Sequence, residues 1–111
     1  MNKVTLVGRL TKDAELIDLN KNDRKGIKFI LAVDKNYKNS NGERETDFIP
    51  IAYFTNYYDR LIQYLLKGAL IAVSGELSIS SFKKQDGTKT YYTEVLADNI
   101  QFLQSKKNMA V

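Results

Sequence analysis

The sequence contains no cysteine and no histidine among its 111 residues. Without cysteine there can be no disulfide and no thiolate nucleophile, and without either residue the usual zinc ligands are missing. Histidine is also the commonest general base. Disulfide scaffolds, zinc sites and triad-type enzymes are therefore poor hypotheses, and no metal, cofactor or catalytic residue is expected.

Long apolar runs are lacking as well. No stretch approaches the ~18 apolar residues that a membrane span needs, and the N-terminus M-N-K-V-T-L lacks the apolar centre of a signal peptide. We therefore expect a cytoplasmic protein without a membrane partner. A chain of 111 residues most simply forms one domain.

The composition combines a net positive charge with many aromatic rings. The formal net charge is +4 and the pI is about 9.2, which favours a polyanionic partner. Seven tyrosines and five phenylalanines accompany these charges, with no tryptophan. Aromatic rings mixed with lysine and arginine are what the binding of single-stranded nucleic acid requires.

Residues 47–54 read D-F-I-P-I-A-Y-F, a strand in which neither face is polar. Because side chains alternate along a strand, Phe48 and Phe54 share one face, and Ile49 and Ile51 share the other. A half-exposed antiparallel strand should have a polar side. Something besides water must cover the second face: another layer, another subunit or a flat apolar ligand.

Alternation predicts four more strands, at residues 1–10, 27–34, 69–82 and 91–103. Gly8 and Gly75 lie inside two of them, where a glycine usually marks a bulge or a sharp bend.

Turns separate these strands. Residues 20–26 read as a turn, residues 36–45 as a protruding hairpin loop that carries Tyr37, and the Asp86–Gly87 pair as a tight hairpin.

A helix is predicted between the third and fourth of these strands, over residues 55–68. Its apolar positions have helical spacing, Thr55 or Asn56 can cap its start, and Gly68 can end it. Five strands with one helix between strands 3 and 4 is the layout of an all-β OB-fold, a Greek-key barrel.

Six stretches, in order along the chain, carry a family resemblance: N-K-V-T-L-V-G-R-L-T-K-D-A-E-L at 2–16, F-I-L-A-V at 29–33, G-E-R-E-T-D-F-I at 42–49, Y-L-L-K-G at 64–68, V-S-G-E-L at 73–77 and D-G-T-K-T-Y-Y-T-E-V at 86–95. With them the chain resembles the bacterial and phage single-stranded DNA-binding proteins. The resemblance implies an OB-fold DNA-binding domain at 1–104, with a short extension at 105–111. It also implies coating of unpaired DNA, without sequence specificity, during replication, recombination and repair.

The resemblance also implies the site residues. The positions that match the family's base-stacking aromatics are Tyr37, Phe48, Phe54 and Phe82. The cations that match or flank its phosphate contacts are Lys3, Arg9, Lys38, Lys67 and Lys84. Without the resemblance, a phenylalanine on a strand would more often be read as a core residue.

Two departures from the family concern the strands. Pro50 stands where relatives often place a polar or basic residue, which puts a hydrogen-bonding contact in doubt. Ser78 and Ser80 carry no charge where relatives often have arginines. Because of these two serines, we expect weaker or more salt-sensitive binding than in a typical member.

The third departure is the end of the chain, K-K-N-M-A-V, where relatives carry a disordered linker and an acidic tip that recruits repair and replication enzymes. The chain is either a trimmed domain or a phage- or plasmid-type form, and such recruitment is doubtful. Residues 2–10 resemble the strand that pairs subunits in the family. A homotetramer is therefore expected, with a dimer as the alternative.

The sequence leaves two alternative functions. A specialised OB-fold relative that binds RNA, or that works in a primosome or conjugation complex, differs mainly in sugar preference, which depends on pocket shape. An enzyme on a small barrel is the weakest hypothesis, because the sequence lacks histidine, cysteine and the glycine-rich nucleotide-binding motifs.

Overall fold

The computed structural model describes residues 1–19 and 24–103, and the predicted extension at 105–111 lies outside them. Along these residues the elements are β1 (Val4–Leu10), β2 (Glu15–Leu19), β3 (Arg24–Lys38), β4 (Arg44–Phe54), α1 (Tyr58–Leu61), β5 (Leu70–Lys83) and β6 (Lys89–Phe102). Among the described residues, no helix has the length and apolar character that a bilayer crossing would need.

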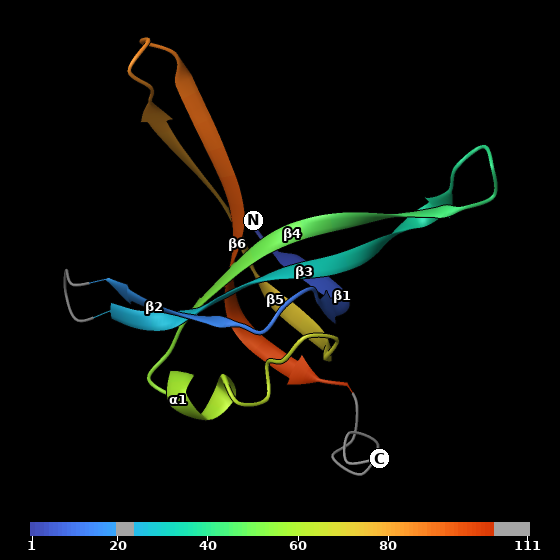
Figure 1. The fold of residues 1–111 in the computed structure, drawn as a ribbon, viewed down its shortest axis with the longest axis horizontal. Coiled ribbons are helices and arrows are strands. Elements are labelled where there is room, and N and C mark those ends of the chain that lie inside the picture. Colours follow the sequence, from blue (N-terminus) through green and yellow to red (C-terminus); the bar gives the residue numbers. More distant parts are fainter. Residues whose placement is uncertain (20–23, 104–111) are drawn as a thin grey trace.

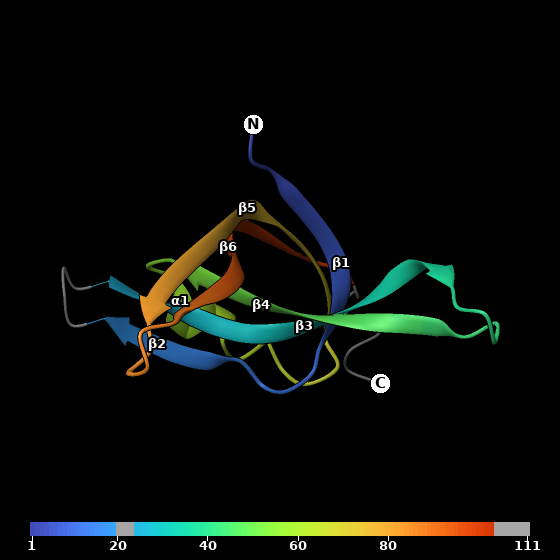
Figure 2. The ribbon, with the colours of Figure 1, turned by 90° about the horizontal axis from the view of Figure 1, so that it is seen from above.

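The strands form one sheet that closes on itself. Their order is β1-β5-β6-β4-β3-β2, and β1 also pairs with β3 through Arg9↔Ala32 and Leu10↔Leu31. All neighbours are antiparallel except β4 and β6. Figure 2 shows β1, β5, β6, β4 and β3 arranged around a common interior. The predicted OB-fold is confirmed.

The core lies inside this barrel and follows from the alternation of side chains along the strands. Residues at every second position point inwards and exclude water, which stabilises each by roughly 1.5–3 kcal/mol. The fully buried large side chains are Ile27, Leu31, Ile51, Leu65, Ile71, Val73 and Val95. The inward face predicted for residues 27–34 and the inward position of Ile51 are thus observed.

Two glycines allow the strands to approach closely. A Cβ on Gly8 would lie 2.3 Å from the Ala32 carbonyl oxygen, and one on Gly75 would lie 2.1 Å from the Leu96 carbonyl oxygen. The register of β5 and β6 shifts between Ser74 and Gly75. The bend predicted at Gly75 therefore appears as an irregularity in the ladder.

The strand β2 was not predicted, so the described sheet has six strands rather than five. Leu16 is exposed and Ile17 is only half-buried, so the segment has no inward face that alternation could detect. Backbone pairing from Glu15↔Lys28 to Leu19↔Arg24 holds it against β3. Residues 24–26, read as part of a turn, belong to β3.

The predicted helix over 55–68 is wrong in length, because α1 spans only Tyr58–Leu61. After α1 the chain forms hydrogen bonds with the end of β1 and with the segment that follows it. The Ala14 amide donates to the Leu65 carbonyl (2.9 Å), and the Gly68 amide donates to the Leu10 carbonyl (2.9 Å). These bonds take the place of further helical turns and bring Leu65 against the core.

Two hairpins project from the barrel in different directions (Figure 1). We call residues 34–47 the β3–β4 arm and residues 76–94 the β5–β6 arm. The predicted loop at 36–45 does protrude, but its strands run to Lys38 and from Arg44, which leaves a short turn.

The turn of the β5–β6 arm is the tight hairpin expected from the Asp-Gly pair. Gly87 has a φ of 90°, which glycine adopts without strain. The Asp86 carboxylate accepts hydrogen bonds from the Thr88 hydroxyl (2.7 Å) and the Thr88 amide (3.0 Å). These bonds lower the pKa of Asp86.

Candidate nucleic-acid interface

The outer surface of the barrel carries apolar side chains on four neighbouring strands. Ile51 and Val95 point into the core, so residues at odd spacings from them point outwards. Ile30 on β3 lies opposite Pro50 on β4 in the ladder. We call the outward apolar set of β3, β4, β5 and β6 the aromatic stripe; its members are Ile30, Phe48, Pro50, Phe82 and Tyr92.

Two of the four predicted stacking residues belong to this stripe. Phe48, at the base of the β3–β4 arm, is 65% exposed, and Phe82, near the tip of the β5–β6 arm, is 55% exposed. A ring this open to water is available to a flat ligand. At Phe48, therefore, the second apolar face of residues 47–54 is open to solvent and is not covered by the core of the barrel.

Tyr37 lies on the other side of the sheet. It is exposed and lines a hollow with Val33, Asp47 and Ile49. Asp47 and Ile49 alternate away from Phe48 along β4. The structure therefore does not bring Tyr37 onto the aromatic stripe.

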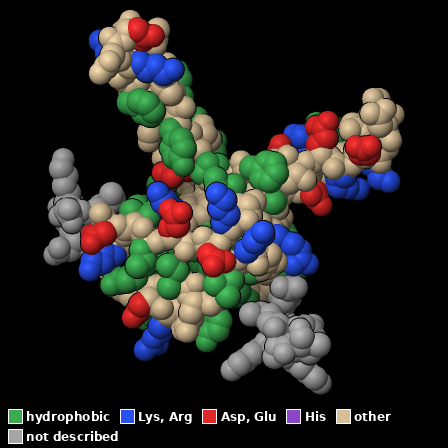
Figure 3. All heavy atoms as spheres, in the orientation of Figure 1, with side chains coloured by type: hydrophobic (Ala, Val, Ile, Leu, Met, Phe, Trp, Pro, Cys, Tyr) green, Lys and Arg blue, Asp and Glu red, His purple; other side chains and the backbone are tan. Residues whose placement is uncertain are grey.

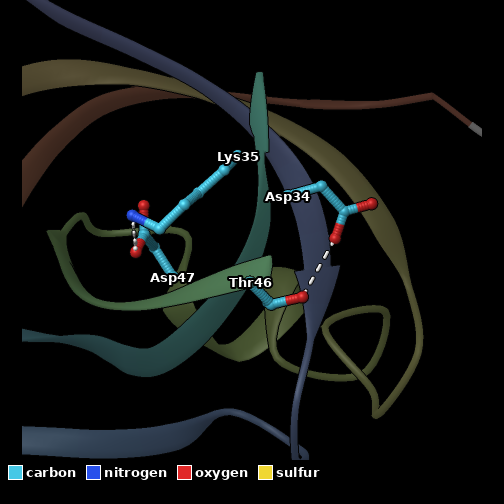
Figure 4. A network of polar contacts seen from close by, with 4 residues as sticks. All are labelled: Asp34, Lys35, Thr46 and Asp47. Carbon is cyan, nitrogen blue, oxygen red and sulfur yellow. Dashed lines mark hydrogen bonds and ion pairs between the residues drawn. The ribbon is translucent and has the colours of Figure 1, made fainter. Parts of the chain in front are cut away.

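Polar contacts join the two strands at the base of the β3–β4 arm, as Figure 4 shows. The Lys35 ammonium lies 2.8 Å from an Asp47 carboxylate oxygen, and the Thr46 hydroxyl donates to Asp34 (3.1 Å). The hydrogen bond to Asp47, together with its negative charge, raises the pKa of Lys35. These contacts flank the shift of register between Asp34 and Lys38.

Phe54 alternates onto the same face of β4 as Phe48 and Pro50, but it is half-buried, and a cation already covers its ring. The Arg24 guanidinium lies 4.2 Å from the ring centroid, a cation–π contact. Lys3 lines the same hollow as Arg24 and Phe54. A base that stacked on this ring would have to displace Arg24 or slide beside it.

The remaining predicted cations fall into two places. Lys38 and Lys84 are exposed on the β3–β4 and β5–β6 arms. Arg9 and Lys67 share a hollow beside Gly68, where the Arg9 guanidinium donates to the Gly68 carbonyl (2.7 Å). The described lining of that hollow includes none of the four predicted aromatics.

In Figure 3 hydrophobic side chains run along the β5–β6 arm and meet others near the base of the β3–β4 arm. Lys and Arg side chains lie on the body of the barrel between the two arms. Hydrophobic and basic side chains thus share this face, with acidic side chains among them. Over residues 1–19 and 24–103, no three acidic side chains gather closely enough to hold a metal ion.

Sequence reasoning missed two residues of this surface, Arg24 and Tyr92. Arg24 was hidden in the segment read as a turn. Tyr92 could have been found by counting outwards from the Asp86–Gly87 turn. That count places Tyr92 opposite Ser80 and Thr90 opposite Phe82, as the ladder has them.

Comparison with known proteins agrees with this geometry. The sequence profile described as "Single-strand binding protein family" matches residues 1–103. The chain belongs to that family.

Several family members resemble the chain over most of its length. "Single-stranded DNA-binding protein 1" of Clostridium acetobutylicum is 36% identical, with 96% of this chain and 97% of that protein covered. "Single-stranded DNA-binding protein 1" of Lactococcus lactis is 44% identical, covering 96% of this chain and 71% of that protein.

A solved structure of the family has the same fold. A chain of the Plasmodium falciparum SSB complex with ssDNA superimposes with a TM-score of 0.77 at 27% identity. The match covers 94% of this chain and 96% of that chain.

Proposed function

We propose that this member of the single-strand binding protein family binds single-stranded DNA without sequence specificity. The protein would coat the unpaired DNA, protect it and keep it single-stranded during replication, recombination and repair. The observation that carries the proposal is the exposure of Phe48 and Phe82 on the outer side of one closed sheet. Every base has a π-face, so a ring can stack on it without reading sequence, at roughly 1–3 kcal/mol per base.

Positive charge supplies the second part of the affinity. Lys3 lines the same hollow as Phe54, Lys38 follows Tyr37, and Lys84 is two residues from Phe82. A cation next to a stacked base can contact the neighbouring phosphate, and the release of counterions then favours binding. The role is binding rather than catalysis.

Assembly and location follow the family. We propose a homotetramer, with a dimer as the alternative, in the bacterial cytoplasm or nucleoid. Light scattering of the purified chain gives its mass in solution. A stable monomer would contradict the assembly part of the proposal.

The binding proposal is tested by fluorescence anisotropy with labelled oligo-dT at one stated salt concentration. Unlabelled duplex DNA, oligo-dT and oligo-U serve as competitors. We expect oligo-dT to compete far better than duplex DNA, because stacking needs unpaired bases. Equal competition by duplex would refute the proposal, and stronger competition by oligo-U would favour an RNA-binding role.

A variant pair tests the stacking residues. Phe48→Ala is expected to weaken oligo-dT binding roughly 5- to 150-fold, which corresponds to the loss of one stacked base. Phe48→Leu keeps an apolar side chain of similar bulk but removes the ring. It is the matched control that separates the loss of the ring from the loss of side-chain volume. If both variants bind like the unchanged protein, Phe48 is not a stacking residue.

A further inference from the structure

We propose that Tyr92 and Pro50 form an additional platform for one unpaired nucleobase, in the hollow between β3, β4 and β6. The inference rests on the proposed function, because it extends the path of the bound strand across the barrel. It adds a base contact that is not among the four predicted stacking residues.

The hollow itself is the first observation. It has a volume of about 260 Å³, and its walls include Ile30, Pro50 and Tyr92. Tyr92 is 46% exposed and Ile30 is 41% exposed, so neither is a core residue. The flat phenol and the proline ring present apolar surface of the kind that meets the face of a base.

The position of the hollow is the second observation. Tyr92 lies opposite Ser80, and Phe82 is two residues further along β5. Diagonal neighbours of this kind are about 7–8 Å apart. On the other side, Pro50 and Phe48 are two residues apart on β4, about 7 Å along the strand. The hollow therefore lies between the two exposed rings and continues the surface that they form.

The charges around the hollow indicate a base rather than a phosphate. Its rim carries two ammonium groups, Lys12 and Lys28, and three carboxylates, Asp13, Glu15 and Glu94. Lys28 is already paired with Glu15 at 3.8 Å. A phosphate would meet net negative charge there, whereas the ring and amino groups of a base carry hydrogen-bond donors that a carboxylate can accept.

Adjacent tyrosines provide a matched experiment. Tyr91 and Tyr92 are both exposed, but they point to opposite faces of β6. Tyr91 lies opposite Ser81, away from the aromatic stripe. Replacing either tyrosine removes one exposed ring from the same arm, so the two variants differ mainly in which face is altered.

The test measures oligo-dT affinity by anisotropy for Tyr92→Ala, Tyr92→Phe and Tyr91→Ala. We expect Tyr92→Ala to bind roughly 5- to 150-fold more weakly, while Tyr92→Phe and Tyr91→Ala stay within about twofold of the unchanged protein. The slope of affinity against salt should not change, since no charge is removed. Melting curves and light scattering establish that all variants fold and assemble alike.

A covalent probe gives a second readout. An oligonucleotide that carries 5-iodo-deoxyuridine is irradiated in the complex, and the cross-linked peptide is identified by mass spectrometry. We expect cross-links at Tyr92 as well as at the rings of Phe48 or Phe82. Absence of the Tyr92 cross-link, together with unchanged affinity of Tyr92→Ala, would overturn the inference.

The failures are distinguishable. If Phe48→Ala weakens binding and Tyr92→Ala does not, the inference is wrong and the proposed function stands. If Tyr91→Ala weakens binding as much as Tyr92→Ala, the effect belongs to the arm as a whole and the inference is also wrong. If duplex DNA competes as well as oligo-dT, both proposals fail.

Discussion

Single residues decide how closely the strands of this barrel approach, and Gly75 is the clearest case. A Cβ there would meet backbone atoms of Leu96 and Ala97 at 2.1 and 2.8 Å. Backbone atoms within a sheet cannot move aside as a flexible side chain can. The space at this position therefore limits the closure of the β5–β6 ladder.

We predict that Gly75→Ala lowers the free energy of unfolding by about 3 kcal/mol or more, since overpacking of a core usually costs 1–3. Gly42→Ala is the comparison, because a Cβ on Gly42 meets nothing within 4 Å and only its φ of 77° is unfavourable. That change should cost about 1–2 kcal/mol. Urea unfolding measures both. Equal stability of Gly75→Ala and the unchanged protein would show that the backbone at Leu96 moves aside at little cost in free energy.

The candidate site was predictable from the family resemblance rather than from a local pattern. Phe48 lies inside the matched stretch at 42–49, and Phe82 lies between the stretches at 73–77 and 86–95. The structure leaves both exposed. Arg24 is different, because its contact with Phe54 depends on the pairing of β3 with β4, in which Phe54 lies opposite Gly26, two residues from Arg24. Residues 24–26 were read as part of a turn, so this pairing was not predicted for Arg24.

At the scale of elements, the two arms are backbone ladders that extend beyond the core, and a few side-chain contacts join their strands. The Lys35–Asp47 pair joins the strands of the β3–β4 arm. Because Asp47 raises the pKa of Lys35, the pair's contribution to stability is present at neutral pH. It is lost as the pH rises through the raised lysine pKa.

Asp47→Asn should lower the pKa of Lys35 towards its ordinary value and free its ammonium beside Tyr37. We predict tighter binding of single-stranded DNA, with a slope of log affinity against log salt that is steeper by about 0.7. Anisotropy over a salt series measures this slope. Asp34→Asn is the control, because that carboxylate accepts from Thr46 instead. An unchanged slope would mean that Lys35 does not reach the strand.

The turn of the β5–β6 arm has the opposite dependence on pH. Hydrogen bonds from Thr88 lower the pKa of Asp86, so their contribution is present at neutral pH and is lost as the pH falls through the lowered pKa. We predict that Thr88→Val raises the pKa of Asp86 towards its ordinary value. NMR titration of the carboxyl carbon measures it. Thr90→Val, two residues along the same strand, should leave this titration unchanged.

The elements themselves were predicted unevenly. The strand at 27–34 and the first half of the strand at 69–82 have clear inward faces, and the structure contains both strands with shifted ends. The helix over 55–68 was predicted too long, because its apolar spacing is compatible with a helix but the bonds from Ala14 and Gly68 favour another path. Contacts distant in sequence decided the outcome.

At the scale of the whole molecule, the element order was sufficient for the OB-fold, although it missed β2. The contact between β1 and β3 that closes the barrel involves only two residue pairs. No pattern within either strand predicts it. The barrel was predictable because its order of strands and helix is one of a small set of layouts. The contact between β1 and β3 that closes the barrel was not predictable.

Salt dependence tests the electrostatic side of the whole interface. If Lys3, Arg9, Lys38, Lys67 and Lys84 each neutralise one phosphate, the slope of log affinity against log salt should be about −3.5 per chain. Lys84→Gln should make this slope shallower by about 0.7 with little change in stability. A slope near zero would mean that binding depends on the rings alone.

The projecting arms have a thermodynamic consequence for DNA capture. Residues 79–83 of the β5–β6 arm are exposed at every position, and a two-stranded ribbon without a second layer is marginal in water. A captured strand would serve as that missing layer, so protein and DNA would stiffen each other. An oligonucleotide too short to reach an arm would then lose binding free energy twice. It would lack the direct contacts with the arm, and it would not stabilise the arm.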